Sequence, residues 1–389
     1  MDFKTLDIFC EVIDNYGDIG VVYRIAKEFK KSFDDSLEIR VILNRLDEFI
    51  AINKNCEKKE IQNINGITYI TKDFLIKNIC TFGTSDVIIE AFGCNIPNEY
   101  MEIAKEKSKL LINLEYLSAE DWIEDFHLQE SPLGLKGLKK YFYMPGFTKK
   151  SGGLIVDSLF LKTKETVLQN KGKYLKKYLE NFEIDFSDKL IGTVFSYEKN
   201  FTPLLESLKK LDKEVILLIM GEKSQQSFVE IFKNISVENF GKTYKYGKIY
   251  MKFMDFLNQE EYEEIINAVD FNFVRGEDSF VRALLTGKPF IWHAYLQDEL
   301  VHMDKVEGFI ERQTEYLREN HDIKVIEKQN KLLRDYNFRK ENTLEIGLEE
   351  YDEFFKNFKE LQSMYFDYSE FLISECNLIN KIKKFIVKY

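Results

Sequence analysis

The sequence is poor in the residues that mark disulfide-stapled, fibrous or disordered chains. Its 389 residues include only 5 cysteines, 5 prolines and 19 glycines. The cysteines are odd in number and show no CxxC spacing, which indicates small buried side chains in a reducing compartment rather than disulfides or a zinc site. With 44% hydrophobic residues, this composition excludes collagen-like and low-complexity chains and predicts well-filled cores.

Signals for a metal, for secretion and for a membrane are also missing. The four histidines show no metal-ligand spacing. The N-terminus, MDFKTLDIFC, carries acidic residues early and lacks the layout of a signal peptide. No apolar run reaches the length of a membrane span. We therefore expect a soluble, cytoplasmic protein that contacts no membrane.

Positive charge is in deficit as well. The chain has 55 lysines and arginines against 66 aspartates and glutamates, which gives a formal net charge of −11. An acidic chain lacks the broad positive field of a duplex-binding protein, so nucleic acid is not expected as a partner. The same charge favours a basic protein as the partner.

What the sequence does contain is a twice-repeated alternation of strands and helices. Its length suits two domains. The segment PGFTKKSGGL, residues 145–154, holds turn residues and is expected to be the linker. Strands are expected before it at 6–13, 37–43, 67–70, 86–92 and 110–114, and after it at 190–195, 214–220, 249–253, 271–274 and 289–293. Helices are expected at 20–31, 202–211, 224–233, 259–268 and 278–285, and through most of 298–389.

This pattern predicts an α/β protein with two successive, doubly wound, mostly parallel sheets and a helical C-terminal tail. We expect domains at residues 1–150 and 151–365, with a final helix at 366–389 that can pack back on the first domain. In such open sheets, ligands bind beyond the carboxyl ends of the strands. Two stretches break the pattern at such strand ends, and both become candidate sites.

The first stretch is FVRGEDS, Phe273–Ser279, where a buried-looking strand runs into a helix. Backbone N–H groups and the dipole at a helix start attract anions. Arg275 adds a fixed charge whose fork suits phosphate oxygens, and Gly276 permits close approach. A diphosphate is therefore the ligand that the stretch suits.

The acids of this stretch require a separate explanation, because they would repel a diphosphate if they pointed inward. Glu277 and Asp278 are expected to orient Arg275 or to bind hydroxyl groups. Asp278 or Ser279 can cap the helix. The alternative interpretation is an ordinary capped helix with a surface arginine.

The second stretch is DNYGDIG, Asp14–Gly20, between the first strand and the first helix. It lacks the GxGxxG pattern, so a dinucleotide-dependent dehydrogenase is the least favoured enzyme. Instead it places two carboxylates four residues apart at a turn. Carboxylates at a cleft can serve as a general base and as a substrate orienter. The alternatives are helix capping by Asp18 and a turn hydrogen bond from Asp14.

Together with these two stretches, three others resemble the EarP family of protein-arginine rhamnosyltransferases, which modify translation elongation factor P. They are NLEYLSAEDW from Asn113, YFYMPGFT with the GGL that follows from Tyr141, and GKPFIWH after FVRGEDSFVRA. The resemblance implies a GT-B glycosyltransferase with two Rossmann-like domains. It also implies dTDP-β-L-rhamnose as donor, inversion at the sugar carbon, elongation factor P as acceptor, and no metal or other cofactor.

The resemblance also implies roles for individual residues. Asp18 matches the proposed base, with Asp14 in support, and Glu277 matches a further catalytic residue. The donor-binding positions correspond to Phe195, Tyr197, Phe256 and Gln259 for the nucleoside and to Arg275, Asp278, Ser279 and Tyr295 for the diphosphate. On the acceptor side, the corresponding residues are Asn15, Tyr16 and Glu115.

The proposed reaction needs carboxylates for a physical reason. A guanidinium stays protonated at neutral pH and is a poor nucleophile. One carboxylate can hold the planar cation through a fork of hydrogen bonds, while another removes a proton as the new bond forms. Two other functions remain open: a GT-B transferase with a lipid or small-molecule acceptor, and a nucleotide-sugar-binding protein without catalysis.

Overall fold

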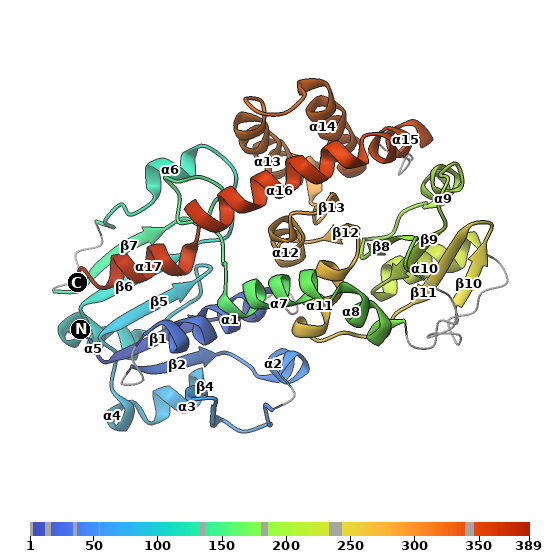
Figure 1. Cartoon of the computed structure of the whole chain (residues 1–389). Coiled ribbons are helices and arrows are strands. Elements are labelled where there is room, and N and C mark those ends of the chain that lie inside the picture. The colour runs from blue at the N-terminus through green and yellow to red at the C-terminus, as the bar shows by residue number, and fades with distance from the viewer. Residues whose placement is uncertain are drawn as a thin grey trace. The chain divides into compact units, whose positions relative to one another are not determined.

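The computed structural model describes residues 3–11, 17–33, 37–53, 55–132, 137–179, 186–232, 243–338 and 346–389. It divides the chain into two compact units, which are described separately (Figure 1). The first unit comprises Met1–Ser158 and Leu372–Tyr389, and the second comprises Leu159–Phe371. The first unit is thus built from both ends of the chain.

The first unit contains a seven-stranded sheet in the order β3-β4-β2-β1-β5-β6-β7. Its strands are parallel except for β3, which pairs antiparallel with β4. The strands are β1 Thr5–Cys10, β2 Glu38–Leu43, β3 Ile61–Ile64, β4 Ile67–Thr71, β5 Val87–Ala91, β6 Leu110–Leu114 and β7 Lys139–Tyr143. The helices are α1 Gly17–Ser32, α2 Asp47–Ile52, α3 Lys72–Lys77, α4 Ile79–Phe82, α5 Asn98–Lys107, α6 Trp122–Phe126 and α17 Leu378–Ile386.

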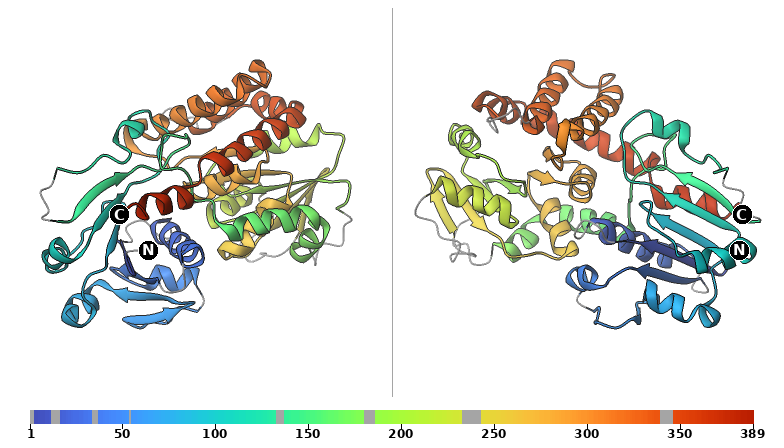
Figure 2. Two further views of the ribbon diagram at one scale, coloured as in Figure 1. Left: turned by 60° about the vertical axis from the view of Figure 1, so that its left-hand side comes forward. Right: turned by 180° about the vertical axis from the view of Figure 1, so that it is seen from behind.

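Each face of this sheet has its own apolar core, because successive side chains of a strand point to opposite faces. Ile8 belongs to the core that is shared with α1, whereas Phe9 belongs to the core under α5. The last helix, α17, lies beside α1 (Figures 1 and 2). It contributes to the same core as α1 through Leu378, Ile379, Ile382, Phe385 and Ile386.

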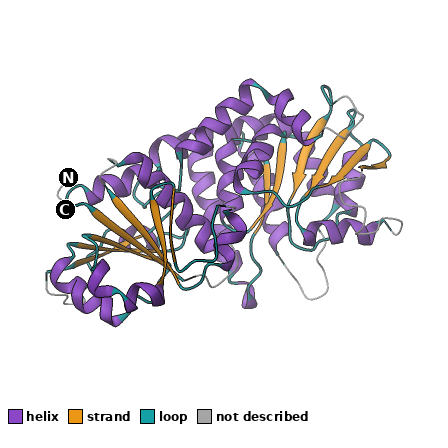
Figure 3. Cartoon of the chain, turned by 90° about the horizontal axis from the view of Figure 1, so that it is seen from below, coloured by secondary structure: helices purple, strands orange, loops and turns teal. Residues whose placement is uncertain are grey.

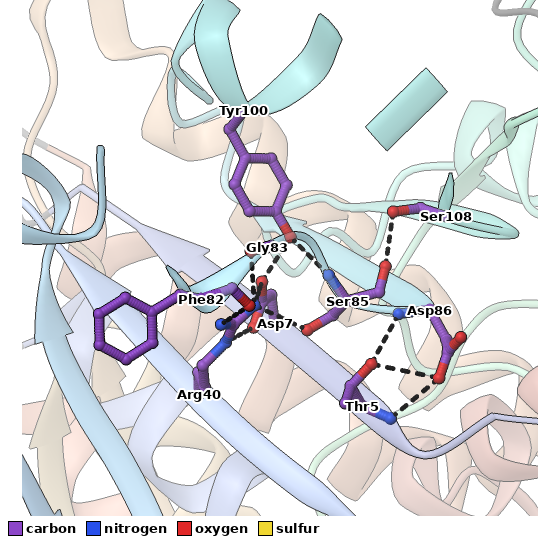
Figure 4. Close-up of polar contacts among 9 residues, drawn as sticks. All are labelled: Thr5, Asp7, Arg40, Phe82, Gly83, Ser85, Asp86, Tyr100 and Ser108. Carbon is purple, nitrogen blue, oxygen red and sulfur yellow. Dashed lines mark hydrogen bonds and ion pairs between the residues drawn. The ribbon is translucent and has the colours of Figure 1, made fainter. Parts of the chain in front are cut away.

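A buried polar network links three parts of the first unit around Asp7 (Figure 4). Arg40 donates through Nε and Nη2 to the two carboxylate oxygens of Asp7, each over 2.6 Å. The Tyr100 hydroxyl donates to the same carboxylate. Arg40 also donates to the carbonyl oxygens of Phe82 and Gly83, over 3.0 and 3.2 Å. Because charge and hydrogen bonds are matched, this buried pair holds β1, β2 and the segment before β5 together.

The second unit contains a six-stranded sheet in the order β10-β11-β9-β8-β12-β13, parallel except for β10. Its strands are β8 Leu190–Val194, β9 Val215–Ile219, β10 Thr243–Tyr246, β11 Ile249–Phe253, β12 Phe271–Arg275 and β13 Phe290–His293. Helices cover both faces of each sheet (Figure 3). Those that follow the strands of the second sheet are α9 Thr202–Lys209, α10 Glu222–Ile231, α11 Gln259–Ala268 and α12 Asp278–Thr286.

Helices also precede and follow this second sheet. α7 Ser158–Gln169 and α8 Lys171–Tyr178 lead into it. After it come a 3-10 turn, η2 Asp298–Leu300, and the helices α13 His302–Leu317, α14 Ile323–Asn337, α15 Leu348–Lys356 and α16 Phe358–Glu375. In the described part of the chain, none of the helices combines the length and apolar character needed to cross a membrane.

The α/β class with two parallel-dominated sheets and C-terminal helices, predicted from the sequence, is confirmed. Three strands had not been predicted: β3, β7 and β10. The segment 145–154, expected as a linker, lies in the first unit, where Phe147, Ser151 and Leu154 are buried. Leu154 forms a parallel bridge with Asn377, just before α17.

Candidate active site

In the second unit, the carboxyl ends of β8 and β12 bring an arginine between two aromatic rings. The two strands are parallel neighbours, with Val194 opposite Phe273, so the residues that follow them meet at one edge. The Arg275 guanidinium lies 4.6 Å from the ring centre of Phe195 and 5.0 Å from that of Tyr197. Stacking of this kind fixes a guanidinium plane without using its hydrogen-bond donors.

The charge of Arg275 is not neutralised by an acid within the described residues. It forms no ion pair there, and its Nη1 donates a 3.5 Å hydrogen bond to the carbonyl oxygen of Ser196. Burial lowers the pKa of Arg275, while Tyr197, Glu198 and Tyr262 oppose that change. The guanidinium thus keeps donors for a ligand that carries negative charge.

Other cations gather around the same edge. His293, at the end of β13, is buried, and its pKa is held well below the usual value by burial first. The positive charges of Lys199, Arg275 and Lys223 lower it further. Lys223 pairs with Glu198 over 3.3 Å, so Lys199 and Arg275 are the cations at this edge that favour a phosphate-bearing ligand.

Two glycines allow this arrangement. Gly276 has a φ of +69°, which side-chain-bearing residues rarely adopt. Its N–H donates to the His293 carbonyl oxygen over 3.1 Å. Gly221, just before α10, has a φ of +76°, and a Cβ there would lie 2.7 Å from the Phe195 ring. A larger residue at 221 would displace the ring that supports Arg275.

The two acids of the FVRGEDS stretch, Glu277 and Asp278, do not orient Arg275, contrary to one interpretation of the sequence. Glu277 instead pairs with Lys305 of α13 over 2.7 Å, and Asp278 lies 3.9 Å from Arg282 on the next turn of α12. Both acids have basic neighbours, so they need not repel a bound anion. The capping prediction was also wrong: Glu277, not Asp278 or Ser279, occupies the N-cap, without a side-chain capping bond.

Of the other residues predicted to bind the donor, only some lie at the Arg275 cluster. Tyr295 packs edge-on against Tyr197, with ring centres 5.9 Å apart, so it joins the Arg275 cluster. Gln259 is the first residue of α11, and Phe256 precedes that helix with 73% of its surface exposed. Within the described residues, neither is joined to the cluster by a hydrogen bond, an ion pair or a ring contact. Ser279 lies in the first turn of α12.

In the first unit, the ends of β1, β5 and β6 gather a second set of side chains. Asp18 lies in the first turn of α1 and is 7% exposed. The Tyr116 hydroxyl donates to Asp18 Oδ1 over 3.3 Å. The Tyr116 ring in turn stacks on Phe92, with ring centres 4.6 Å apart. β5 lies between β1 and β6 in the sheet, which explains why these three ends converge.

The acceptor residues predicted from the sequence are only partly described. Glu115 follows β6, and its carboxylate accepts a 2.7 Å hydrogen bond from the buried Asn113 side chain. This fixes Glu115 near Tyr116 at the same sheet edge. Asp14, Asn15 and Tyr16 lie outside the described residues.

Sequence reasoning missed several residues that support the Arg275 cluster. Ser196, Gly221, His293 and Tyr336 were not singled out, although they contact or adjoin the predicted residues. Ser196, Gly221 and His293 do lie at strand ends, which is the one local signal that could have found them. Tyr336 lies at the end of α14 and carries no such signal.

A family model described as Elongation-Factor P (EF-P) rhamnosyltransferase EarP matches residues 6–387 of the chain. A protein-arginine rhamnosyltransferase of Pseudomonas putida is 32% identical over 313 residues, covering 79% of this chain and 80% of the relative. A protein of the same name from Shewanella oneidensis is 33% identical over 319 residues, covering 78% of this chain and 79% of that relative. One from Neisseria meningitidis is 32% identical over 313 residues, covering 78% of this chain and 77% of that relative.

Solved structures show the same architecture over the whole chain. A structure described as the basis for EarP-mediated arginine glycosylation of translation elongation factor EF-P has a TM-score of 0.65 at 21% identity, covering 99% of both chains. A glycosyltransferase from Rickettsia africae has a TM-score of 0.52 at 12% identity, covering 100% of this chain and 98% of the other. This likeness confirms the GT-B fold class that was predicted.

Proposed function

Because this chain belongs to the EarP family of elongation factor P rhamnosyltransferases, we propose that it transfers rhamnose from dTDP-β-L-rhamnose to an arginine of elongation factor P. The transfer inverts the configuration at the sugar carbon and requires neither a metal nor another cofactor. The protein acts in the cytoplasm, where translation factors work. The observation that carries this proposal is the Arg275 guanidinium, stacked between Phe195 and Tyr197 with no carboxylate partner in the described residues.

On the donor side, the diphosphate lies against Arg275 and the first turn of α12. The guanidinium fork and the helix-start amides stabilise the charge that grows on the leaving diphosphate as the glycosidic bond breaks. Tyr295, edge-on to Tyr197, adds a phenol to the same cluster. The aromatic character of Phe195 and the exposed Phe256 suits the thymine and ribose.

On the acceptor side, Asp18 is the base and Glu115 holds the guanidinium of the incoming arginine. A guanidinium nitrogen forms a bond to the sugar carbon C1 as the bond from C1 to the phosphate oxygen breaks. The electron pair of the broken bond leaves with dTDP, and the proton lost by the nitrogen passes to the Asp18 carboxylate. Two carboxylates suit this task because one pairs with the cation while the other accepts the proton.

The test is intact-mass spectrometry of elongation factor P after incubation with this protein and dTDP-β-L-rhamnose in the presence of EDTA. One added deoxyhexose, localised by fragmentation to an arginine, is the expected result. Elongation factor P with that arginine replaced by lysine is the matched acceptor control, and dTDP-glucose is the donor control. Absence of the added mass, with dTDP binding shown separately, would overturn the acceptor assignment while leaving the nucleotide site.

A further inference from the structure

The last two residues of α14, Tyr336 and Asn337, reach the candidate donor site from a distant part of the sequence. Both are 1% exposed, and the reaction proposed above uses neither. Each contacts a different strand-end loop of the second unit. Together they connect the loops that flank Arg275.

Tyr336 supports the loop after β8. Its hydroxyl lies 3.0 Å from Ser196 Oγ, which in turn lies 2.9 Å from His293 Nδ1. Ser196 stands between Phe195 and Tyr197, so this bond, together with those of its backbone N–H and carbonyl oxygen to Ser224 Oγ, holds the loop that carries both rings. All three members of the chain Tyr336–Ser196–His293 are buried. A buried polar chain whose members are hydrogen-bonded to one another makes the segments that it joins more rigid.

Asn337 supports the loop after β13. Its Nδ2 donates to the Trp292 carbonyl oxygen over 2.8 Å, and its Oδ1 accepts from the Ala294 amide over 2.7 Å. Its own carbonyl oxygen lies 3.0 Å from Nε2 of the buried His302, whose Nδ1 accepts from the Gln297 amide over 3.2 Å. An amide can donate only to an unprotonated nitrogen, so the His302 proton sits on Nε2 and points to Asn337.

The contacts of Asn337 and His302 hold the loop that carries Tyr295 both before and after that residue. Ala294 precedes Tyr295 and is fixed by Asn337, and Gln297 follows it and is fixed by His302. The loop also contains Glu299 and Leu300 at positive φ, a backbone conformation that costs free energy unless its surroundings hold it. Tyr295 itself is 57% exposed, so the backbone contacts rather than burial define its position.

We propose that Tyr336 and Asn337 are positioning residues for the donor diphosphate, because they hold the Phe195–Tyr197 loop and the Tyr295 loop around Arg275. The inference rests on the proposed function and extends it to a segment outside the strand-end motifs. Neither residue touches the ligand. They act by ordering its binding loops before it arrives, which lowers the entropy lost on binding.

The chain offers a matched control for Tyr336. Tyr351 of α15 is also buried, and both rings pack against Phe273 of β12, with ring centres 6.1 and 6.2 Å away. In the described part of the chain, the Tyr351 hydroxyl has no hydrogen-bond partner. Tyr336→Phe therefore removes a loop contact, whereas Tyr351→Phe makes the same chemical change beside the same strand without removing one.

The experiment measures dTDP binding by calorimetry and amide hydrogen exchange by mass spectrometry in the full chain. We expect Tyr336→Phe to weaken dTDP binding roughly fivefold, or by about 1 kcal/mol, because the loosened loop must then be ordered when dTDP binds. We also expect faster exchange at residues 194–198 and 274–278. Tyr351→Phe should change neither quantity, and measurement well below the thermal midpoints of both variants excludes global unfolding as the cause.

Asn337→Ala gives an independent test, with Asn330→Ala as its control. Asn330 is a buried asparagine of the same helix whose Nδ2 donates to Thr314 over 2.8 Å, away from the strand ends. Asn337→Ala should speed exchange at residues 293–298 and weaken dTDP binding, and Asn330→Ala should do neither. Unchanged exchange in these loops, or unchanged dTDP affinity despite faster exchange, would overturn the inference. If the wild-type protein failed to bind dTDP, the proposed donor would be wrong, and the exchange data alone would decide whether the loops are held.

Discussion

The Tyr116 hydroxyl lies 3.3 Å from Oδ1 of Asp18, and this contact joins the end of β6 to the first turn of α1. It fixes a largely buried carboxylate at a sheet edge that also carries Glu115. A carboxylate held in one orientation by a phenol suits a base better than a freely rotating one. The contact is long for an O–H···O hydrogen bond, so it orients the Asp18 carboxylate while stabilising its negative charge only weakly.

Asp18→Asn should abolish most turnover and leave dTDP binding unchanged. Loss of a general base typically lowers kcat by roughly 10²–10⁴-fold. Tyr116→Phe, which removes only the orienting contact, should lower kcat by less than about tenfold. Single-turnover mass spectrometry of elongation factor P measures both. A near-normal rate for Asp18→Asn would exclude Asp18 as the base.

Arg275→Ala should impair both donor binding and turnover. Removing one donor to a developing oxyanion costs about 2.7–4 kcal/mol, or roughly 10²–10³ in kcat. Arg275→Lys tests geometry, because it keeps the charge but loses the fork and much of the stacking on Phe195 and Tyr197. We expect lysine to recover only a small part of the rate. Calorimetry with dTDP and single-turnover kinetics distinguish binding from chemistry, and wild-type dTDP affinity in Arg275→Ala would place the diphosphate elsewhere.

Because Lys199 is buried, we expect the free energy of unfolding to depend on pH. It is 6% exposed, and burial lowers its pKa from 10.5 to about 8. Between these two values the unfolded chain binds more protons than the folded one, so this residue makes stability rise with pH across the window. Below pH 8 its destabilising effect is fully present.

Lys199→Met should therefore raise the free energy of unfolding at pH 7, by up to about 3 kcal/mol, and have little effect near pH 10.5. Part of this gain is offset by the lost contact of its Nζ with the Tyr336 ring, 4.4 Å away. Urea unfolding at both pH values measures the difference. Lys223→Met is the control for the loss of a lysine charge at the same edge, because that side chain is 49% exposed. A pH-independent effect of Lys199→Met would contradict this account.

Arg40→Met should destabilise the first unit strongly. It leaves the Asp7 carboxylate fully buried without its cation, which typically costs about 3–5 kcal/mol. The double variant Asp7→Leu/Arg40→Met removes both charges and should recover much of this loss. Urea unfolding followed by circular dichroism compares the three proteins. If the double variant were as unstable as Arg40→Met, packing rather than the unpaired charge would be responsible.

The alternation of apolar strands and amphipathic helices was sufficient to predict the two sheets. β6 and β11 have the predicted bounds, and each is a mostly apolar run that follows a lysine, Lys109 or Lys248. The missed strands β3 and β10 are polar edge strands of antiparallel hairpins, which lack that apolar signal. For β3 a different signal was present. Asn65-Gly66, both at positive φ, is a dipeptide typical of two-residue hairpin turns.

The candidate site shows the same limit at the level of side chains. The family resemblance, rather than any local pattern, assigned Arg275, Phe195, Tyr197 and Tyr295 to one donor site, and the structure brings them together. The partner of Glu277 could not be predicted, since Lys305 lies 28 residues further along the chain on another helix. Tyr336 lies 140 residues beyond Ser196. Pairings over such separations depend on how helices pack, and a local sequence pattern carries no information about that.

The shared core of α1 and α17 has a consequence for synthesis on the ribosome. Residues 378–386 complete an apolar core whose other members are made before residue 156. The second unit is complete once residue 371 has been made, whereas the core of the first unit also needs residues 378–386. Until then the core that α1 shares with α17 lacks the five apolar side chains of α17, and exposed apolar surface of this kind is prone to aggregation. A nascent chain truncated before residue 378 would keep that surface permanently.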